Sequence, residues 1–75
     1  TDTVYYQVLG ARGEYLAGER EFPPPSEEEI VAPGVVRLRD DKYQGMELRV
    51  AYMWVPLEPL GARLALVQVA ETLDK

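Results

Sequence analysis

Residues 46–55 read Met-Glu-Leu-Arg-Val-Ala-Tyr-Met-Trp-Val, and this stretch decides the fold class of the chain. Successive side chains of a β-strand point to opposite faces, so Met46, Leu48, Val50, Tyr52 and Trp54 share one face. Aromatic and β-branched residues favour this extended conformation. The stretch therefore predicts a long strand, with Val50 and Tyr52 buried on its apolar face.

Four further runs have the composition of strands, and they are Val4–Leu9, Glu14–Ala17, Val35–Asp41 and Arg63–Ala70. In the third of these runs, Val36 and Leu38 alternate with Arg37 and Arg39. The last run is apolar on both faces except at Gln68, which indicates a central strand that is covered on both sides.

Glycine and proline mark the connections between these runs. Gly10-Ala11-Arg12-Gly13 reads as a turn, and Tyr43-Gln44-Gly45 reads as a three-residue hairpin loop with Gly45 in the left-handed conformation. Residues 18–34 form a long connection that contains Pro23-Pro24-Pro25, which fits neither a helix interior nor a central strand. Within it, Ser26-Glu27-Glu28-Glu29 is a capping box that predicts a short helix ending before Pro33-Gly34.

Two pairs of strands joined by a helix-bearing crossover predict an α+β, mostly β fold. We expect a PAS-like, five-stranded antiparallel sheet in the order 2-1-5-4-3, with the short helix between the second and third strands. A chain of 75 residues accommodates a single domain, residues 1–75. A core of this size supplies only about 3–5 kcal/mol, so we expect the chain to be part of a larger domain or to bury surface against a partner.

The charge of the chain is concentrated in one segment. Its net charge is −5, and residues 13–29 account for all of it with six glutamates against Arg20. Nucleic acid is not an expected partner, because binding of phosphates needs a basic face. The sequence has no cysteine and no histidine, which excludes disulfides, zinc sites and the common pairs of nucleophile and base. No run reaches the roughly 18–20 apolar residues of a membrane-spanning helix.

Arginines in the strands suggest a site for an anion. We expect Arg37, Arg39 and Arg49 to lie on one sheet face with Lys42 nearby, where guanidinium groups bind a di- or tricarboxylate. The alternative is a solvated face on which Arg39 and Arg49 pair with neighbours such as Glu47.

Arg49 differs from the other arginines because it interrupts an apolar strand. Either it binds a carboxylate ligand, or it forms an ion pair with Glu47, Asp40 or Asp41. Aromatic side chains offer a second kind of site, since Tyr6 and Tyr52 either line a ligand cavity or belong to the core.

Catalysis is not expected of this chain. Glu27-Glu28-Glu29 is its densest acidic cluster, but consecutive residues of a helix do not face one another, so it makes a poor metal site. Gly10-Ala11-Arg12-Gly13 lacks the helix that follows a phosphate-binding loop. We therefore predict no catalytic residue, no metal and no cofactor within these residues.

Four segments together resemble a known family, and they are Asp2–Val8, Ala11–Gly18, Tyr43–Ala51 and Val67–Leu73. In this order they resemble the extracytoplasmic N-terminal sensor region of bacterial two-component sensor histidine kinases, and most closely the tricarboxylate (citrate-type) group. The positions that match the family pattern are Asp2, Tyr6, Gly13, Gly18, Gly45, Arg49, Val69 and Ala70. The family has a helical segment before the position of Asp2, and this N-terminal helix is absent here.

The resemblance implies a periplasmic sensing domain of an inner-membrane kinase, which perceives a small carboxylate or a periplasmic binding protein. It places the kinase core, with its ATP and magnesium, beyond Lys75, and the response regulator is then a partner of the parent protein. We also expect a homodimer or higher assembly, because a five-stranded sheet needs cover on its apolar face and one short helix provides little of it. The alternative from another functional class is a dimerisation or partner-docking module that binds no small ligand.

Overall fold

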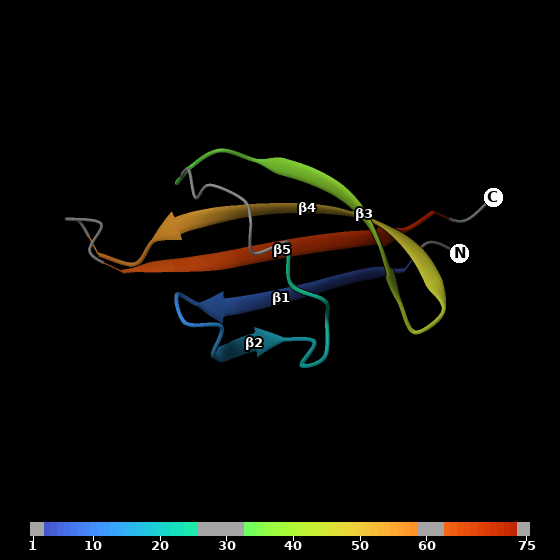
Figure 1. Ribbon diagram of the computed structural model, residues 1–75, viewed down its shortest axis with the longest axis horizontal. Helices are drawn as coiled ribbons and strands as arrows, with labels where there is room; N and C mark the ends of the chain where they lie inside the picture. Colours follow the sequence, from blue (N-terminus) through green and yellow to red (C-terminus); the bar gives the residue numbers. More distant parts are fainter. Residues whose placement is uncertain (1–2, 26–32, 59–62, 74–75) are drawn as a thin grey trace.

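The structure is a computed structural model that describes residues 3–25, 33–58 and 63–73 (Figure 1). These residues form five strands: β1 Val4–Gly10, β2 Tyr15–Gly18, β3 Arg37–Tyr43, β4 Met46–Pro56 and β5 Leu64–Thr72. All five predicted strands are confirmed, with shifts of their ends. The helix predicted at Ser26–Glu29 lies outside the described residues, and the described part of the chain contains no helix.

The strands form one antiparallel sheet in the order β2-β1-β5-β4-β3, which confirms the predicted order. β5 is central, because Val69 pairs with Tyr6 of β1 on one side and with Ala51 of β4 on the other. β1 begins beside the end of β5, where the backbone N–H of Thr72 donates to the carbonyl oxygen of Thr3 at 3.2 Å. The described chain therefore enters and leaves the sheet at the same end (Figure 1).

The β3–β4 hairpin has a two-residue loop, so the predicted three-residue loop is wrong. Tyr43 pairs with Met46, which leaves only Gln44 and Gly45 in the turn. Their φ angles are 51° and 79°, the positive pair of a turn whose twist matches that of the flanking strands. Gln44 was not expected in this conformation, because positive φ favours glycine and asparagine.

Gly18 ends β2 at a position that only glycine fits. Its φ is +85°, and a Cβ there would collide with the carbonyl oxygen of Tyr6. That oxygen accepts a hydrogen bond from the backbone N–H of Glu19 at 2.8 Å, which fixes the direction in which the chain leaves β2. The glycine thus starts the crossover toward β3.

One sheet face is covered by the crossover segment, residues 19–25, and we call it the covered face. Figure 1 shows this segment crossing β1 to reach β5. Phe22 from the segment is 3% exposed and packs in a cluster with Leu48, Val50 and Tyr52 of β4, which are 0–2% exposed. Burial of Val50 and Tyr52 is therefore confirmed.

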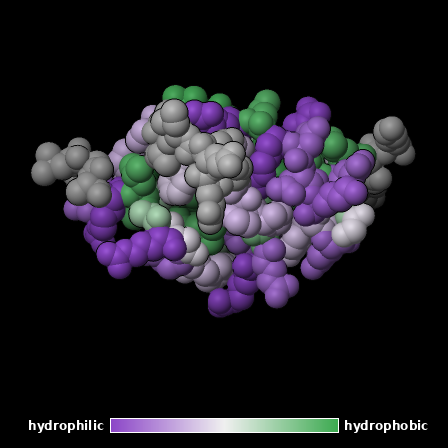
Figure 2. Space-filling view, viewed as in Figure 1, coloured by the Kyte–Doolittle hydropathy of each residue, from purple (hydrophilic) through white to green (hydrophobic). Residues whose placement is uncertain are grey.

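In the same view, Figure 2 shows hydrophilic residues gathered over the β3–β4 hairpin.

The opposite face, which we call the open face, has no cover from the described residues. Val69 of β5 is 45% exposed, and Leu38 of β3 is 65% exposed. The prediction that β5 is covered on both sides is therefore wrong for the described chain. Its apolar residues on the two faces pack differently: Leu66 is 2% exposed on the covered face, whereas Val69 remains accessible on the open one.

Candidate functional site

Arg39 is the most constrained charged side chain on the covered face. It is 15% exposed, and its Nε donates to Asp41 Oδ2 at 3.0 Å. Its Nη2 donates to the carbonyl oxygen of Pro23 at 2.7 Å, and its guanidinium carbon lies 4.8 Å from the centre of the Tyr52 ring. The arginine is thus held between the sheet and the crossover segment, with an ion pair, a carbonyl and an aromatic face around it.

Two glutamines lie beside it in the middle of the sheet. Gln7 of β1 and Gln68 of β5 are 1% and 0% exposed, and Gln68 Nε2 donates to Gln7 Oε1 at 3.0 Å. Gln68 Nε2 also donates to the carbonyl oxygen of Pro23 at 3.3 Å, and Gln7 Nε2 donates to that of Glu19 at 2.7 Å. These bonds attach the crossover segment to the two central strands.

Pro23 is the point where the arginine and the glutamines meet. Its carbonyl oxygen accepts from both Arg39 and Gln68, so these side chains converge from β3 and β5 on one atom. Proline has a fixed φ and no N–H, so it presents this carbonyl without a backbone donor of its own to satisfy. We call Arg39, Asp41, Tyr52, Gln68 and Pro23 the covered-face cluster.

Two buried polar atoms of the cluster have no hydrogen-bond partner, Arg39 Nη1 and Gln68 Oε1. One is a donor and the other an acceptor. A buried polar group without a partner costs about 1–3 kcal/mol, and more when it is charged, so native proteins rarely leave such atoms unpaired. A bound group that accepts from the guanidinium and donates to the amide oxygen would satisfy both.

The structure places the five residues that the sequence suggested as ligand contacts on two different faces of the sheet. Arg37, Arg39 and Tyr52 share the covered face, where Arg37 pairs in register with Tyr52 across β3 and β4. Arg49 and Tyr6 lie on the open face instead. The expectation of three arginines on one face is therefore wrong. Asp40, not Arg39, pairs in register with Arg49, so these two share a face and Arg39 points the other way.

Arg49 forms an exposed ion pair. Its Nε donates to Asp40 Oδ1 at 2.8 Å, and the two side chains are 51% and 66% exposed. Of the two roles considered for Arg49, the structure gives it the pairing with Asp40. Exposed pairs of this kind contribute about 0–1 kcal/mol, so Arg49 is of small importance for the fold.

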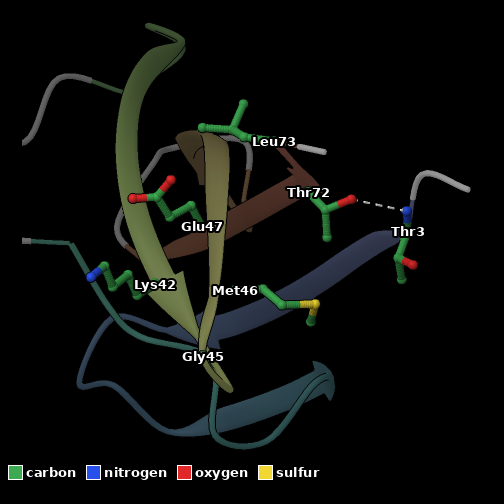
Figure 3. A pocket seen from close by; sticks show the side chains of 7 residues that line it. All are labelled: Thr3, Lys42, Gly45, Met46, Glu47, Thr72 and Leu73. Carbon is green, nitrogen blue, oxygen red and sulfur yellow. Dashed lines mark hydrogen bonds between the residues drawn. The ribbon is translucent and has the colours of Figure 1, made fainter. Parts of the chain in front are cut away.

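A wide depression of about 500 Å³ lies at the end of the sheet where the chain enters and leaves (Figure 3). It is lined by Thr3, Lys42, Gly45, Met46, Glu47, Thr72 and Leu73. Met46 and Glu47 are successive residues of β4 and point to opposite sides in Figure 3. The depression therefore wraps around the end of the sheet and does not enclose a ligand.

Tyr43 is buried beside an acidic segment. It is 7% exposed, and its hydroxyl donates to Glu19 Oε2 at 3.1 Å. Burial, followed by the hydrogen bond and the negative charge of Glu19, raises the pKa of Tyr43 above its ordinary value of 10.0. The phenol therefore stays protonated, and it ties the crossover segment to the end of β3.

Glu14 has a local structural role in the β1–β2 turn. Backbone N–H groups of Glu14 itself and of Arg12 lower the pKa of the Glu14 carboxyl. The Arg12 N–H lies 2.9 Å from Glu14 Oε1. The carboxylate thus closes the turn and is not a candidate for acid–base chemistry.

Sequence reasoning missed Gln68 and Pro23 of the covered-face cluster, and also the neighbouring Gln7. Gln68 was visible as the one polar interruption of an apolar central strand, and a fully buried amide requires partners. Gln7 could have been found as its neighbour once β1 and β5 were paired. Pro23 gave no signal, because it takes part through its backbone carbonyl.

The described residues form a small antiparallel sheet. Its covered face holds a polar cluster beneath the crossover segment, and its open face is exposed. Nowhere in this part of the chain do three His, Cys, Asp or Glu side chains group to hold a metal ion. No helix among the same residues is long and apolar enough to cross a membrane.

Comparison with known proteins identifies the family. Residues 1–75 match the family model described as two-component sensor kinase N-terminal, and the chain belongs to this family. No curated protein and no solved structure matches the chain. The chain is therefore the N-terminal, sensing module of a sensor kinase.

Proposed function

We propose that this domain is the PAS-like periplasmic sensor of a membrane-bound two-component histidine kinase, and that its signal is a small carboxylate bound at the covered-face cluster. The family of the chain supports the sensing role. In this proposal the domain itself carries no catalytic group or cofactor. ATP, magnesium and the contact with a response regulator belong to the kinase part of the parent protein.

The observation that carries the carboxylate proposal is the state of Arg39. Its guanidinium is fixed by Asp41, Pro23 and Tyr52, yet Nη1 is buried without an acceptor. A guanidinium that is already oriented loses little entropy when it binds a planar carboxylate. Arg37 lies in the next position of the same face and adds positive charge.

Gln68 sets a further requirement on the ligand. Its unpaired Oε1 accepts a hydrogen bond, so the ligand needs a donor close to its carboxylate. A hydroxycarboxylate has both groups, and citrate is one such molecule. Binding would join β3, the crossover segment and β5 through one ligand, and β5 continues to Thr72 at the end where the chain leaves the sheet.

Thermal and urea unfolding of this chain with citrate, and with dicarboxylates that lack a hydroxyl, test the proposal. Citrate at about 100 times its dissociation constant should raise the free energy of unfolding by about 2.7 kcal/mol. Arg39→Lys keeps the charge but loses the fork, so it should abolish the increase. Arg63→Lys is the matched control, because Arg63 pairs with Glu58 and its side chain is 72% exposed.

Nuclear magnetic resonance separates a lost site from a destabilised fold. Citrate should shift the side-chain amide signals of Gln68 in the wild type and in Arg63→Lys, but not in a folded Arg39→Lys variant. The carboxylate proposal is wrong if no tested carboxylate shifts these signals or the unfolding midpoint of the wild type.

The second candidate is a docking module that senses a protein partner and binds no small molecule. The open face favours it, since Leu38 is 65% and Tyr6 54% exposed there. A periplasmic binding protein that docks on this face should shift the backbone signals of Leu38 and Tyr6 and leave those of Gln68 unchanged.

A further inference from the structure

The two edges of the sheet differ in how their backbone groups are satisfied. β2 forms one edge and is only four residues long. Its Tyr15 hydroxyl donates to the carbonyl oxygen of Gly18 at 2.7 Å, and the guanidinium carbon of Arg20 lies 4.2 Å from the centre of the Tyr15 ring. Side chains therefore close this edge, which is one way in which proteins protect the unpaired backbone of an edge strand.

β3 forms the other edge, and its register shows which backbone groups face outward. In a hairpin with a two-residue turn, the pair of residues that flanks the turn exchanges both backbone hydrogen bonds, and bonded and non-bonded pairs then alternate. Tyr43 pairs with Met46 at this turn. The alternation therefore directs the N–H and C=O groups of Leu38, Asp40 and Lys42 away from β4. In the described part of the chain, β4 is the only strand that pairs with β3.

Two hydrogen bonds agree with this assignment. The N–H of Lys42 donates to Asp41 Oδ1 at 2.8 Å, which requires that it point away from β4. On the other side of β4, the carbonyl oxygen of Glu47 accepts from the N–H of Leu73 at 2.9 Å, as the same alternation demands. The carboxylate of Asp41 thus protects the outer edge of β3 only next to the turn.

The backbone groups farther along this edge have the spacing of a strand. Leu38 and Asp40 each present one N–H and one C=O, and these two sets lie about 7 Å apart along β3. An extended peptide repeats its own groups at this spacing, so it can bond to all four of them. Leu38 is 65% exposed and the Asp40 side chain is 66% exposed, which leaves the approach to these groups open.

We propose that the outer edge of β3 binds an extended segment of a partner protein, which adds antiparallel to β3 as a sixth strand of the sheet. The segment carries an acidic residue opposite Lys42, a basic residue opposite Asp40 and an apolar residue opposite Leu38. Residues that face the covered side lie between these three, so the segment reads acidic-x-basic-x-apolar from its N-terminus. Cross-strand pairs of opposite charge and pairs of apolar residues stabilise such an addition.

A second copy of this chain does not meet the requirement. When two β3 strands pair antiparallel over the whole open edge, Asp40 of each copy lies opposite Asp40 of the other, and Leu38 lies opposite Lys42. Like charges that face each other are destabilising, and a charge gains nothing from an apolar neighbour. The side chains of β3 therefore select against pairing with themselves and in favour of a partner with the complementary pattern.

The edge borders the covered-face cluster. Arg39 lies between Leu38 and Asp40 in the strand, and its side chain points to the covered face, where it bonds to Pro23. An added strand would restrain the part of β3 that holds this guanidinium. The edge thus gives a protein partner a route to the cluster, whatever ligand the cluster binds.

Two peptides of equal composition, both with blocked ends, test the pairing in nuclear magnetic resonance titrations of the chain. TETKTVT has the acidic-x-basic-x-apolar order, and TKTETVT exchanges the two charges. TETKTVT should shift the backbone amide signals of Leu38 and Asp40 with a dissociation constant in the millimolar range, because a short flexible peptide loses much entropy on binding. TKTETVT should bind at least about fivefold more weakly, because both charge pairs become repulsive.

Leu38→Pro and Leu38→Thr separate the backbone of this position from its side chain. The N–H of Leu38 points away from β4, so proline is tolerated there and removes only the outward donor. Both variants lose the leucine side chain and should stay folded, but only Leu38→Thr should still bind TETKTVT.

Hydrogen exchange of the wild type tests the same edge without any substitution. The amides of Leu38 and Asp40 should exchange rapidly in the free chain and slowly with TETKTVT present. The amide of Arg39 is the internal control, because it faces β4 and should be protected in both samples.

Four results overturn the proposal. They are the absence of any shift of the Leu38 and Asp40 amides at millimolar TETKTVT, equal binding of the two peptides, equal binding of TETKTVT by Leu38→Pro and Leu38→Thr, and protection of the Leu38 and Asp40 amides in the free chain. The last result would mean that the edge is already covered. These measurements contain no carboxylate ligand, so their failure leaves the proposed sensing function standing.

Discussion

At the scale of single residues, Tyr43 should make the free energy of unfolding depend on pH in the alkaline range. Its pKa is raised by burial and by Glu19, so the folded chain holds the phenolic proton more tightly than the unfolded chain. The contribution of Tyr43 to the free energy of unfolding is fully present below the unfolded-state pKa of about 10. It is lost as the pH rises through the higher pKa of the folded state, because the unfolded chain loses this proton first. Urea unfolding near about pH 8 and about pH 11 should show this decrease.

Tyr43→Phe identifies the source of the effect. The ultraviolet titration of this variant should lose a step that lies above the ordinary tyrosine pKa of 10.0. The variant should also lose about 1 kcal/mol near neutral pH, since Glu19 loses its hydrogen bond. Tyr6→Phe is the matched control, because it removes a tyrosine that is 54% exposed. If both variants titrate alike, Tyr43 is not the perturbed group.

At the scale of the strands, burial on one face and exposure on the other should appear directly in stability. Val50 is 0% exposed, so Val50→Ala should lower the free energy of unfolding by about 1–3 kcal/mol through a cavity. Val69 is 45% exposed on the open face, and Val69→Ala should change it by less than about 0.5 kcal/mol. Urea unfolding at a dilute, monomeric concentration makes the comparison, and equal losses would show that the faces are assigned wrongly.

The strands and their order could be predicted from sequence because they depend on local patterns. Alternation in residues 46–55 identifies the core face of β4, and Gln44-Gly45 identifies the turn to within a residue. The sequence also shows that Arg37 and Arg39 share a face. Which face of the sheet becomes covered does not follow from alternation, because Val36 and Leu38 are as apolar as a core requires and yet remain exposed.

The candidate site was harder to predict because it depends on register and on backbone. A shift of one residue in the β3–β4 register decides whether Arg49 lies beside Arg39 or on the opposite face of the sheet. In the structure Arg49 pairs with Asp40, so it lies on the opposite face from Arg39. The acceptor shared by Arg39 and Gln68 is the carbonyl of Pro23, 16 residues before Arg39 in the chain. No pattern of side chains marks such an atom, so only the folded crossover segment identifies the cluster.

At the scale of the whole molecule, a single sheet depends on whatever covers its core face. Phe22 is the only phenylalanine of the chain, is 3% exposed, and lies with its ring centre 5.3 Å from that of Tyr43. Phe22→Ala should cost about 3–5 kcal/mol, which matches the whole stability expected of a core this small. We therefore expect this variant to be largely unfolded by circular dichroism at 25 °C.

Two further variants show whether the cover itself is responsible. Phe22→Leu keeps most of the apolar volume and should remain folded with intermediate stability. Pro24→Ala changes an exposed residue of the same segment and should cost less than about 1 kcal/mol. A folded Phe22→Ala variant close to wild-type stability would mean that the sheet does not depend on the crossover segment. A ligand that ties this segment to β3 and β5 would then have little effect on the ends of the sheet, so the same result would also count against signal transmission through the covered face.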